Sequence, residues 1–433
     1  GAAGNRRLFS AATLLRRRPD RVGQKLGNTM IIADARVIIT CPLGQPFVFL
    51  KIVTDEGVYG IGEGTKNGRE LAVATLLQEH IAPMLIGRDP GAIEDIWKLL
   101  YKGAYWRGGP LQMAAISAVD MALWDIKGKV AGLPVYSLLG GPTRTGALTY
   151  YHASGDTPEA TAERVIAAVE KGYRVVRCQV AVEGQSGGYG AAVHDAREEA
   201  ARRRRLPFEG VWEPYAYLRS VAPLFEVVRQ QVGWDVQLLH DAHGRLTPTE
   251  AAQLAKELEP FRLMFLEDPI GPEHAAAMTQ VRAASTTPIA IGEVISSADQ
   301  ILPMVINRTI DYMRCSPIHI GGVTPAKKLA ALAEPFEVKT AFHGPGDVGP
   351  VGDAASVHID LAIQNFGIQE WTEQPDAVKE IVSGGPYFDD GYLKLPDAPG
   401  LGVDIDETLA AQYPYERHYL PIPRREDGSV HGY

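Results

Sequence analysis

Three acidic residues stand at regular intervals in the second half of the chain. Asp241, Glu267 and Glu293 are 26 residues apart twice, and each closes a short apolar run. One strand and one helix of an α/β protein occupy a similar length, so parallel strands would bring the three carboxylates to one edge. Oxygen ligands of this kind suit Mg²⁺, which keeps open positions for water and for a substrate carboxylate. A single strand-end acid more often caps a helix or pairs with an arginine, but three in register favour a metal site.

Two histidines stand where they could transfer protons beside such a metal. A chelated carboxylate stabilises the enediolate that forms when the adjacent carbon loses its proton, so the site also needs bases. His243 lies two residues after Asp241, and strand alternation would point it to the same face. His343 stands near the end of a later apolar run. A lone strand-end histidine is more often structural, but opposite three carboxylates both are interpreted as acid or base groups.

The elements that must position these residues form a repeating pattern after Gly141. Short apolar runs alternate with longer amphipathic segments, which is typical of parallel strands joined by crossover helices. The repeat predicts an α/β fold, a (β/α)₈-type barrel whose chemistry lies at the C-terminal ends of its strands. The eight expected strands are 147–152, 174–180, 236–243, 263–268, 289–293, 312–316, 339–344 and 366–371.

The residues before this repeat predict a smaller domain. Residues 31–64 have the short runs and turn residues of an antiparallel meander. Apolar residues then recur at helical spacing over 71–85, 93–101 and 112–131. An α+β capping domain is therefore expected at 30–145.

The other segments complete the expected organisation. The barrel is expected at 146–375, and residues 376–433 are expected to pack back on the capping domain. The connection 183–218 is too long for an ordinary loop and is interpreted as an active-site flap or a disordered insert. Residues 1–29 hold seven basic residues and one acidic residue, and they are interpreted as a basic tail that is disordered or derived from an expression leader, with a transit peptide as an alternative.

The composition argues against several classes of function. The 433 residues include 43 basic and 52 acidic ones, and this net charge of −9 does not favour a nucleic-acid partner. No apolar run approaches the roughly 20 residues of a membrane span, so no membrane role is expected. Cys41, Cys178 and Cys315 are far apart and odd in number, which indicates reduced thiols and a cytoplasmic location.

Several motifs resemble those of one enzyme group. Residues 115–129, AISAVDMALWDIKGK, resemble the helical signature of the mandelate racemase-like members of the enolase superfamily. Shorter motifs over nearly the whole body of the chain resemble the D-mannonate dehydratase subgroup of that superfamily. These motifs are 67–70 (NGRE), 105–107 (YWR), 149–152 (TYYH), 177–179 (RCQ), 239–243 (LHDAH), 342–345 (FHGP) and 366–370 (FGIQE).

The resemblance implies roles for residues of this chain. It implies that the three spaced carboxylates hold Mg²⁺, and that Tyr189, paired with Arg177, removes the proton next to the substrate carboxylate. A guanidinium beside a phenol favours the ionised phenol, which can then act as a base. His243 would protonate the departing 3-hydroxyl. The residues implied to line the substrate are Asn67, His152, Arg314, His343, Asp347 and Glu370.

The implied reaction is dehydration of a small-molecule acid sugar, with D-mannonate first, to a 2-keto-3-deoxy acid, by a hydro-lyase that forms a homo-oligomer. The sequence departs from the family pattern at Gly346, at Trp371 and at 315–318, and one lost hydroxyl contact alters discrimination among epimers. D-Gluconate or another acid sugar therefore stays an alternative substrate. Two further alternatives are a hydroxy-acid racemase or epimerase that uses His343 as a second base, and a binding or regulatory protein that keeps the metal site.

Overall fold

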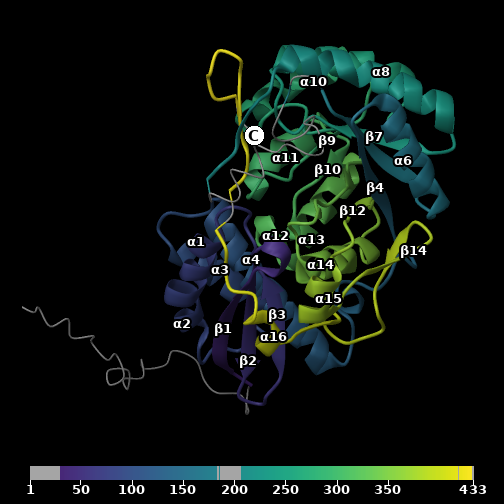
Figure 1. Ribbon diagram of the computed structural model, residues 1–433. Helices are drawn as coiled ribbons and strands as arrows, with labels where there is room; N and C mark the ends of the chain where they lie inside the picture. The colour runs from purple at the N-terminus through teal and green to yellow at the C-terminus, as the bar shows by residue number, and fades with distance from the viewer. Residues whose placement is uncertain (1–29, 183–184, 186–205, 418, 432–433) are drawn as a thin grey trace, which may run out of the picture.

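The computed structural model describes residues 30–182, 185, 206–417 and 419–431 (Figure 1). The first domain begins with the predicted meander, in which β1 (Ile32–Thr40), β2 (Phe47–Thr54) and β3 (Tyr59–Glu63) pair antiparallel in that order. Along β2 successive side chains point to opposite faces, and both faces are buried. Val48, Leu50 and Ile52 pack with the first-domain helices, whereas Phe47 and Phe49 pack with the barrel core. The sheet is thus held between two cores.

The first-domain helices confirm the predicted helical spacing, with one interruption. They are α1 (Glu70–Thr75), α2 (Ala82–Leu85), α3 (Ile93–Gly103), α4 (Pro110–Ala131) and the short α5 (Val135–Leu138). The stretch predicted as one helix over 71–85 contains a π-helical turn at Leu76–Ile81. Pro83 follows this turn and has no amide hydrogen to continue the ordinary helical ladder.

The helix α4 lies unusually close to β3. A Cβ atom at Gly62 would stand 1.8 Å from the carbonyl oxygen of Ala118, so only glycine permits this approach.

Two acidic residues of the 115–129 signature, which lies within α4, contact distant parts of the chain. Asp120 accepts a hydrogen bond from the Thr324 amide at 2.9 Å, and Asp125 accepts one from the Leu401 amide at 2.8 Å. These two acids therefore fix α4 to the barrel and to the C-terminal segment.

Parallel strands follow at all eight predicted places, and they close into a barrel. β4 pairs with β12 as well as with β5, which joins the two ends of the strand order. Between β11 and the run before β12, the Gly367 amide donates to the Thr340 carbonyl at 2.9 Å. The barrel strands are β4 (Ala147–Gly155), β5 (Val175–Val180), β7 (Gln237–Asp241), β8 (Leu266–Glu267), β9 (Ile289–Ile291), β10 (Tyr312–Met313), β11 (Lys339–Thr340) and β12 (Gln369–Glu370).

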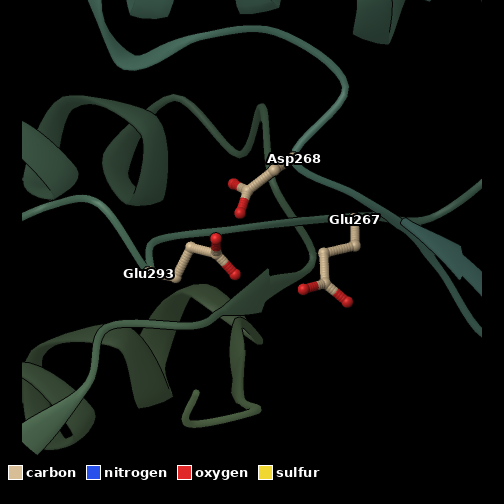
Figure 2. Close-up of side chains that lie close together, drawn as sticks. All are labelled: Glu267, Asp268 and Glu293. Carbon is tan, nitrogen blue, oxygen red and sulfur yellow. The ribbon is translucent and has the colours of Figure 1, made fainter. Parts of the chain in front are cut away.

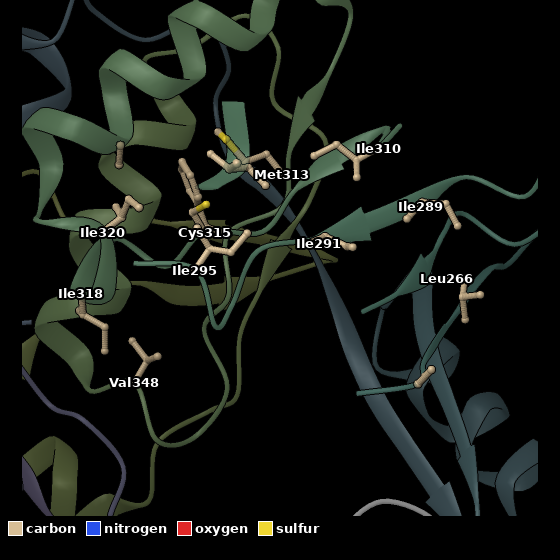
Figure 3. Packing of buried hydrophobic residues seen from close by; sticks show 14 of the residues in the cluster. Leu266, Ile289, Ile291, Ile295, Ile310, Met313, Cys315, Ile318, Ile320 and Val348 are labelled. Carbon is tan, nitrogen blue, oxygen red and sulfur yellow. The ribbon is translucent and has the colours of Figure 1, made fainter. Parts of the chain in front are cut away.

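Helices follow the strands and cover the barrel. Figure 3 shows Ile291 of β9, Met313 of β10 and Ile318 of the following short helix among the buried residues beneath the strand ends. This packing holds the strand ends in place. The helices are α6 (Pro158–Glu170), α8 (Pro214–Val232), α9 (Pro248–Glu257), α10 (Met278–Ala284), α11 (Ala298–Ile306), α12 (Pro317–Ile320), α13 (Val323–Ala333) and α14 (Pro350–Leu361). In the ranges that the structure describes, no helix combines the length and apolarity needed to cross a membrane.

The C-terminal segment contacts three parts of the molecule. Its hairpin of β14 and β15 adds to β4 of the barrel. Glu407 pairs with Lys51 of the first domain at 2.8 Å. β17 pairs in parallel with β6, just before α8. The elements are α15 (Asp376–Ile381), β13 (Val382–Gly384), β14 (Tyr387–Asp389), β15 (Tyr392–Lys394), β16 (Val403–Ile405), α16 (Glu407–Ala410) and β17 (Ile422–Arg424), and β6 is Glu209–Val211.

These contacts refine the expected organisation. Glu407 contacts the first domain, the hairpin contacts the barrel and β17 contacts β6, and the packing expected for 376–433 stays a prediction. The domain boundaries at 145 and 375 stay predictions. Of the long connection 183–218, residues 183–184 and 186–205 lie outside the described ranges, and its last part forms β6 and the start of α8.

Candidate active site

Three carboxylates meet where two neighbouring strands end. Glu267 is the last residue of β8, Asp268 follows it, and Glu293 stands two residues after β9. Each offers an oxygen atom within 4.8 Å of the others. Figure 2 shows Asp268 and Glu293 turned towards each other beside Glu267. Because β8 and β9 are adjacent and parallel, their carboxyl ends share one edge of the barrel.

The donor atoms of this group fit Mg²⁺. Glu267 Oε2 and Asp268 Oδ2 are buried and have no hydrogen-bond partner within the described ranges. Burial raises the pKa of both carboxyls well above the ordinary range, and nearby carboxylates add to the effect. Arg314 brings positive charge, with its Nη2 2.6 Å from Glu267 Oε1 and 3.5 Å from Glu293 Oε2. One arginine beside three acids leaves negative charge that a divalent ion with a preference for oxygen would neutralise.

Asp241 lies beside this group, and its carboxylate oxygens contact His243 and Arg177. It ends β7, opposite Glu267 in the strand register. Its Oδ1 accepts a hydrogen bond from the His243 amide at 2.7 Å, and its Oδ2 lies 3.3 Å from Arg177 Nη1. Although burial opposes this, His243 and Arg177 hold the pKa of Asp241 below its ordinary value. The structure therefore places two of the predicted ligands together with Asp268, and puts Asp241 next to them.

Asp268 was missed because strand alternation would point it away from Glu267. Its backbone has a φ of +35°, which ends the extended conformation at this residue. The side chain consequently returns to the same edge as Glu267. The signal in the sequence was only that an acid directly follows a predicted ligand.

His243 lies in the site, but the backbone conformation that directs its side chain there differs from the predicted one. β7 ends at Asp241, and His243 has a left-handed backbone with a φ of +58°. Strand alternation, on which the orientation was predicted, therefore does not apply at this residue. The left-handed turn brings Nδ1 within 3.3 Å of Asp241 Oδ2 and 3.6 Å of Glu293 Oε1. The histidine is thus beside the carboxylates, as expected.

Glu370 on β12 contacts two arginines and one histidine. Its Oε2 lies 2.6 Å from Arg314 Nη2, and its Oε1 lies 3.1 Å from His152 Nε2 and 3.4 Å from Arg177 Nη1. Burial opposes ionisation, but chiefly Arg314 holds the pKa of Glu370 well below its usual range. Glu370 is therefore a fixed carboxylate that joins both arginines.

His152 is neutral in this arrangement. Arg177 Nη2 lies 3.3 Å from His152 Nδ1, and because a guanidinium can only donate, Nδ1 must accept. The ring proton is then on Nε2, which faces Glu370. Burial lowers the pKa of His152, which agrees with the neutral ring.

These groups open into a cavity of about 750 Å³. Of the predicted site residues, those that line it are Asn67, Arg177, His243, Glu293, His343, Asp347 and Glu370. Asn67, from the loop after β3, donates to Asp347 Oδ2 at 3.1 Å and so joins the first domain to the barrel loops. His152 and Arg314 contact Glu370 from outside this lining. Tyr189 lies outside the described residues.

Sequence reasoning also missed several lining residues. Lys66 precedes Asn67, and Arg425 and His431 come from the C-terminal tail. Lys66 was adjacent to a predicted residue, so its charge was an available signal. The tail residues gave no signal, because contacts between distant parts of the chain, such as the pairing of β17 with β6, bring them to the barrel.

The chain matches two family models. Residues 29–140 match the mandelate racemase/muconate lactonizing enzyme N-terminal domain. Residues 160–409 match the enolase C-terminal domain-like family. The two matches cover the first domain and most of the barrel.

Relatives and solved structures agree with these matches. The D-mannonate dehydratase of Caulobacter vibrioides is 49% identical over 399 residues, which cover 92% of this chain and 98% of the relative. A D-galactonate dehydratase family member of Halomonas elongata is 48% identical over 401 residues, covering 93% and 99%. An enolase of Pantoea ananatis, solved with bound D-gluconate and Mg, has a TM-score of 0.87 and 41% identity, and the match covers 93% and 100% of the two chains.

Proposed function

The chain belongs to the mandelate racemase/muconate lactonizing enzyme family of the enolase superfamily, and on this premise we propose that it is a Mg²⁺-dependent hydro-lyase that dehydrates an acid sugar. The observation that carries the proposal is the carboxylate group at the ends of β8 and β9, of which Asp268 and Glu293 line a cavity together with His243 and Arg177. D-Mannonate is the proposed substrate because relatives named D-mannonate dehydratase are 49% identical. The product would be a 2-keto-3-deoxy acid.

We assign the metal to Asp241, Glu267 and Glu293, with Asp268 as a further oxygen donor. When bound, Mg²⁺ supplies positive charge to the substrate carboxylate and to the negative charge that develops as the neighbouring carbon loses its proton. Arg314 holds Glu267 in position, with 2.6 Å between Nη2 and Oε1. A fixed carboxylate loses little freedom when it binds an ion or a ligand, which favours catalysis.

The base in this proposal is Tyr189, which follows β5 in the sequence. Arg177 on β5 is fixed between Asp241 and Glu370, 3.3 and 3.4 Å from their oxygen atoms. A guanidinium held in this way favours the ionised form of a phenol that approaches it. His343 is a further residue that can contact the substrate, because it lines the cavity.

His243 is proposed to complete the loss of water. Its Nδ1 faces Asp241 Oδ2 at 3.3 Å, and since a carboxylate only accepts, Nδ1 carries a hydrogen. When the ring is the imidazolium, Nε2 also carries a hydrogen, and it is the atom that can give a proton to the 3-hydroxyl group. The bond from C2 to hydrogen breaks, the proton goes to the base, and the bond from C3 to oxygen breaks as water leaves. The resulting enol takes a proton at C3 to give the 2-keto acid.

The test is turnover of a panel of five- and six-carbon acid sugars with Mg²⁺, measured as 2-keto product, for the wild type and Tyr189→Phe. The proposal expects one acid to be converted by the wild type and a loss of at least 100-fold in Tyr189→Phe, since a positioned base contributes about 10²–10⁴-fold. D-Gluconate belongs in the panel because a similar enolase was solved with it bound. Tight binding of an acid sugar without turnover would overturn the proposal and favour a binding or regulatory protein.

We also propose a cellular compartment and an oligomeric state for the protein. Cys41, Cys178 and Cys315 are all buried and free of disulfides, which supports a reducing, cytoplasmic compartment. A homo-oligomer is expected from the family resemblance, and light scattering of the purified chain would test it.

A further inference from the structure

The C-terminal tail is anchored beside the barrel mouth by specific contacts. Figure 1 shows the tail rising from α16 towards the upper end of the molecule, where the C-terminus is marked. β17 pairs in parallel with β6, and the Trp212 amide donates to the Arg424 carbonyl at 2.8 Å. The Glu426 amide donates to Glu213 Oε1 at 2.7 Å. The tail is thus attached to the segment that leads into α8.

His431 is the point at which this tail meets the barrel. Its ring stacks on the fully buried Trp212, with 4.9 Å between centroids and 17° between planes. Arg425 Nε donates to His431 Nδ1 at 3.3 Å, so this nitrogen accepts. Nε2 therefore carries the proton, and it lies 2.9 Å from the carbonyl oxygen of Arg245, which can only accept. Both ring nitrogens are engaged, which leaves His431 no role as an acid or base.

The acceptor of this bond belongs to the loop that carries His243. Arg245 is two residues after His243, and the two residues share the cavity lining with His431. On its other side the same loop is held by the Gly244 amide, which donates to the Asp268 carbonyl at 2.6 Å. The loop is therefore fastened between the β8 end and the tail.

His243 needs such support because its conformation is unfavourable. A left-handed backbone at a non-glycine residue costs about 1 kcal/mol or more and persists where surrounding contacts fix it. Rotation of this turn would move Nδ1 away from Asp241, now 3.3 Å distant, and would move Nε2 from the leaving hydroxyl. A displacement of about 1 Å in such a group can reduce the rate about 100-fold.

We propose that His431 is a positioning residue for the acid step: through its hydrogen bond to the Arg245 carbonyl, the C-terminal tail holds the 243–246 loop and thereby His243. This inference rests on the proposed function, in which His243 gives a proton to the departing 3-hydroxyl. It adds that this step depends on His431, a residue of the C-terminal tail that is far from His243 in the sequence.

Two substitutions separate the hydrogen bond from the stacking. His431→Phe keeps a ring on Trp212 and removes both nitrogens, whereas His431→Gln keeps an amide donor that can reach the Arg245 carbonyl. His80→Phe is the control, because His80 is an exposed histidine in the first domain. Each protein is incubated with Mg²⁺ and acid sugar in D₂O, and NMR follows both water loss and deuterium at C2 of the recovered substrate.

The inference expects His431→Phe to slow water loss about 10- to 100-fold while C2 exchange changes less than about threefold. His431→Gln should retain more of the water loss, and His80→Phe should match the wild type. Equal loss of both reactions in His431→Phe, or no loss of either, would overturn the inference, because a general structural role affects both steps.

A second readout does not depend on turnover. Amide hydrogen exchange over residues 242–247 should be faster in His431→Phe than in the wild type and His80→Phe, because the loop loses the hydrogen bond that attaches it to the tail. Unchanged exchange there would overturn the inference even if the enzyme is active. If the wild type converts no acid sugar, the proposed function fails, and this exchange measurement alone decides whether the tail holds the loop.

Discussion

Arg314→Met should destabilise the protein far more without Mg²⁺ than with it. Arg314 is fully buried, and its Nη2 lies 2.6 Å from both Glu267 and Glu370. Removing one partner of a buried ion pair typically costs about 3–5 kcal/mol, because the other charge stays buried without compensation. The methionine side chain fills most of the space but brings no charge.

Glu370 and Glu267 differ in the partners that they keep after Arg314 is replaced. Glu370 keeps His152 at 3.1 Å and Arg177 at 3.4 Å. Glu267 Oε2 has no hydrogen-bond partner in the described ranges, so most of the destabilisation should arise at Glu267. A bound Mg²⁺ would supply the missing positive charge. With saturating Mg²⁺ the loss should therefore fall to about 1–2 kcal/mol, the scale of the lost hydrogen bonds.

The assay is denaturant unfolding of wild type and Arg314→Met, each in EDTA and in saturating Mg²⁺. Arg229→Met is the matched control, because Arg229 is also buried but donates to carbonyls, including that of Val236 at 2.8 Å. Replacing Arg229 should lower the free energy of unfolding by the same amount with and without Mg²⁺. An equal loss for Arg314→Met in both conditions would refute the argument that Glu267 is a metal ligand in contact with Arg314.

Three further predictions concern single residues. Asp268→Asn should weaken Mg²⁺ binding in calorimetry about 10- to 100-fold, whereas Asp360→Asn, a buried acid outside the group, should not; unchanged affinity in Asp268→Asn would remove it from the site. Lys66→Met should raise KM several-fold with little effect on kcat. Lys66 lines the cavity and forms no ion pair within the described ranges, so its positive charge can attract an acid anion. An unchanged KM would contradict this prediction. Burial lowers the pKa of His240 from 6.5 to about 4, so the folded state disfavours its protonation, and stability should fall by about 3 kcal/mol as pH drops from about 6.5 to 4. His240→Gln should flatten that part of the unfolding free energy against pH, and an unchanged slope would show that other groups cause it.

The strand positions could be predicted from the sequence because each barrel strand lies in a short apolar run, and polar residues end most of these runs. Glu267 and Glu293 followed from this pattern, since strand order alone brings neighbouring carboxyl ends together. The buried arginine Arg314 could be assigned a role only from the family resemblance. Its contact with Glu267 at 2.6 Å shows why a cation is needed at that position.

The parts that could not be predicted depend on backbone turns and on distant pairings. His243 and Asp268 have positive φ values of 58° and 35°, and a two-residue alternation gives no information about such residues. The contribution of His431 to the cavity requires β17 to lie on β6, which is more than 200 residues away in the chain. Pairings this remote leave no local periodicity in the sequence.

We propose that this site removes the C2 proton and then expels the 3-hydroxyl group with Mg²⁺ present. The most direct measurement is NMR of D-mannonate incubated with the protein in D₂O, with Mg²⁺ and with EDTA. We expect a 2-keto-3-deoxy acid with one solvent deuterium at C3 in Mg²⁺, and no product in EDTA. Deuterium at C2 without any loss of water would contradict it and would indicate a racemase or epimerase.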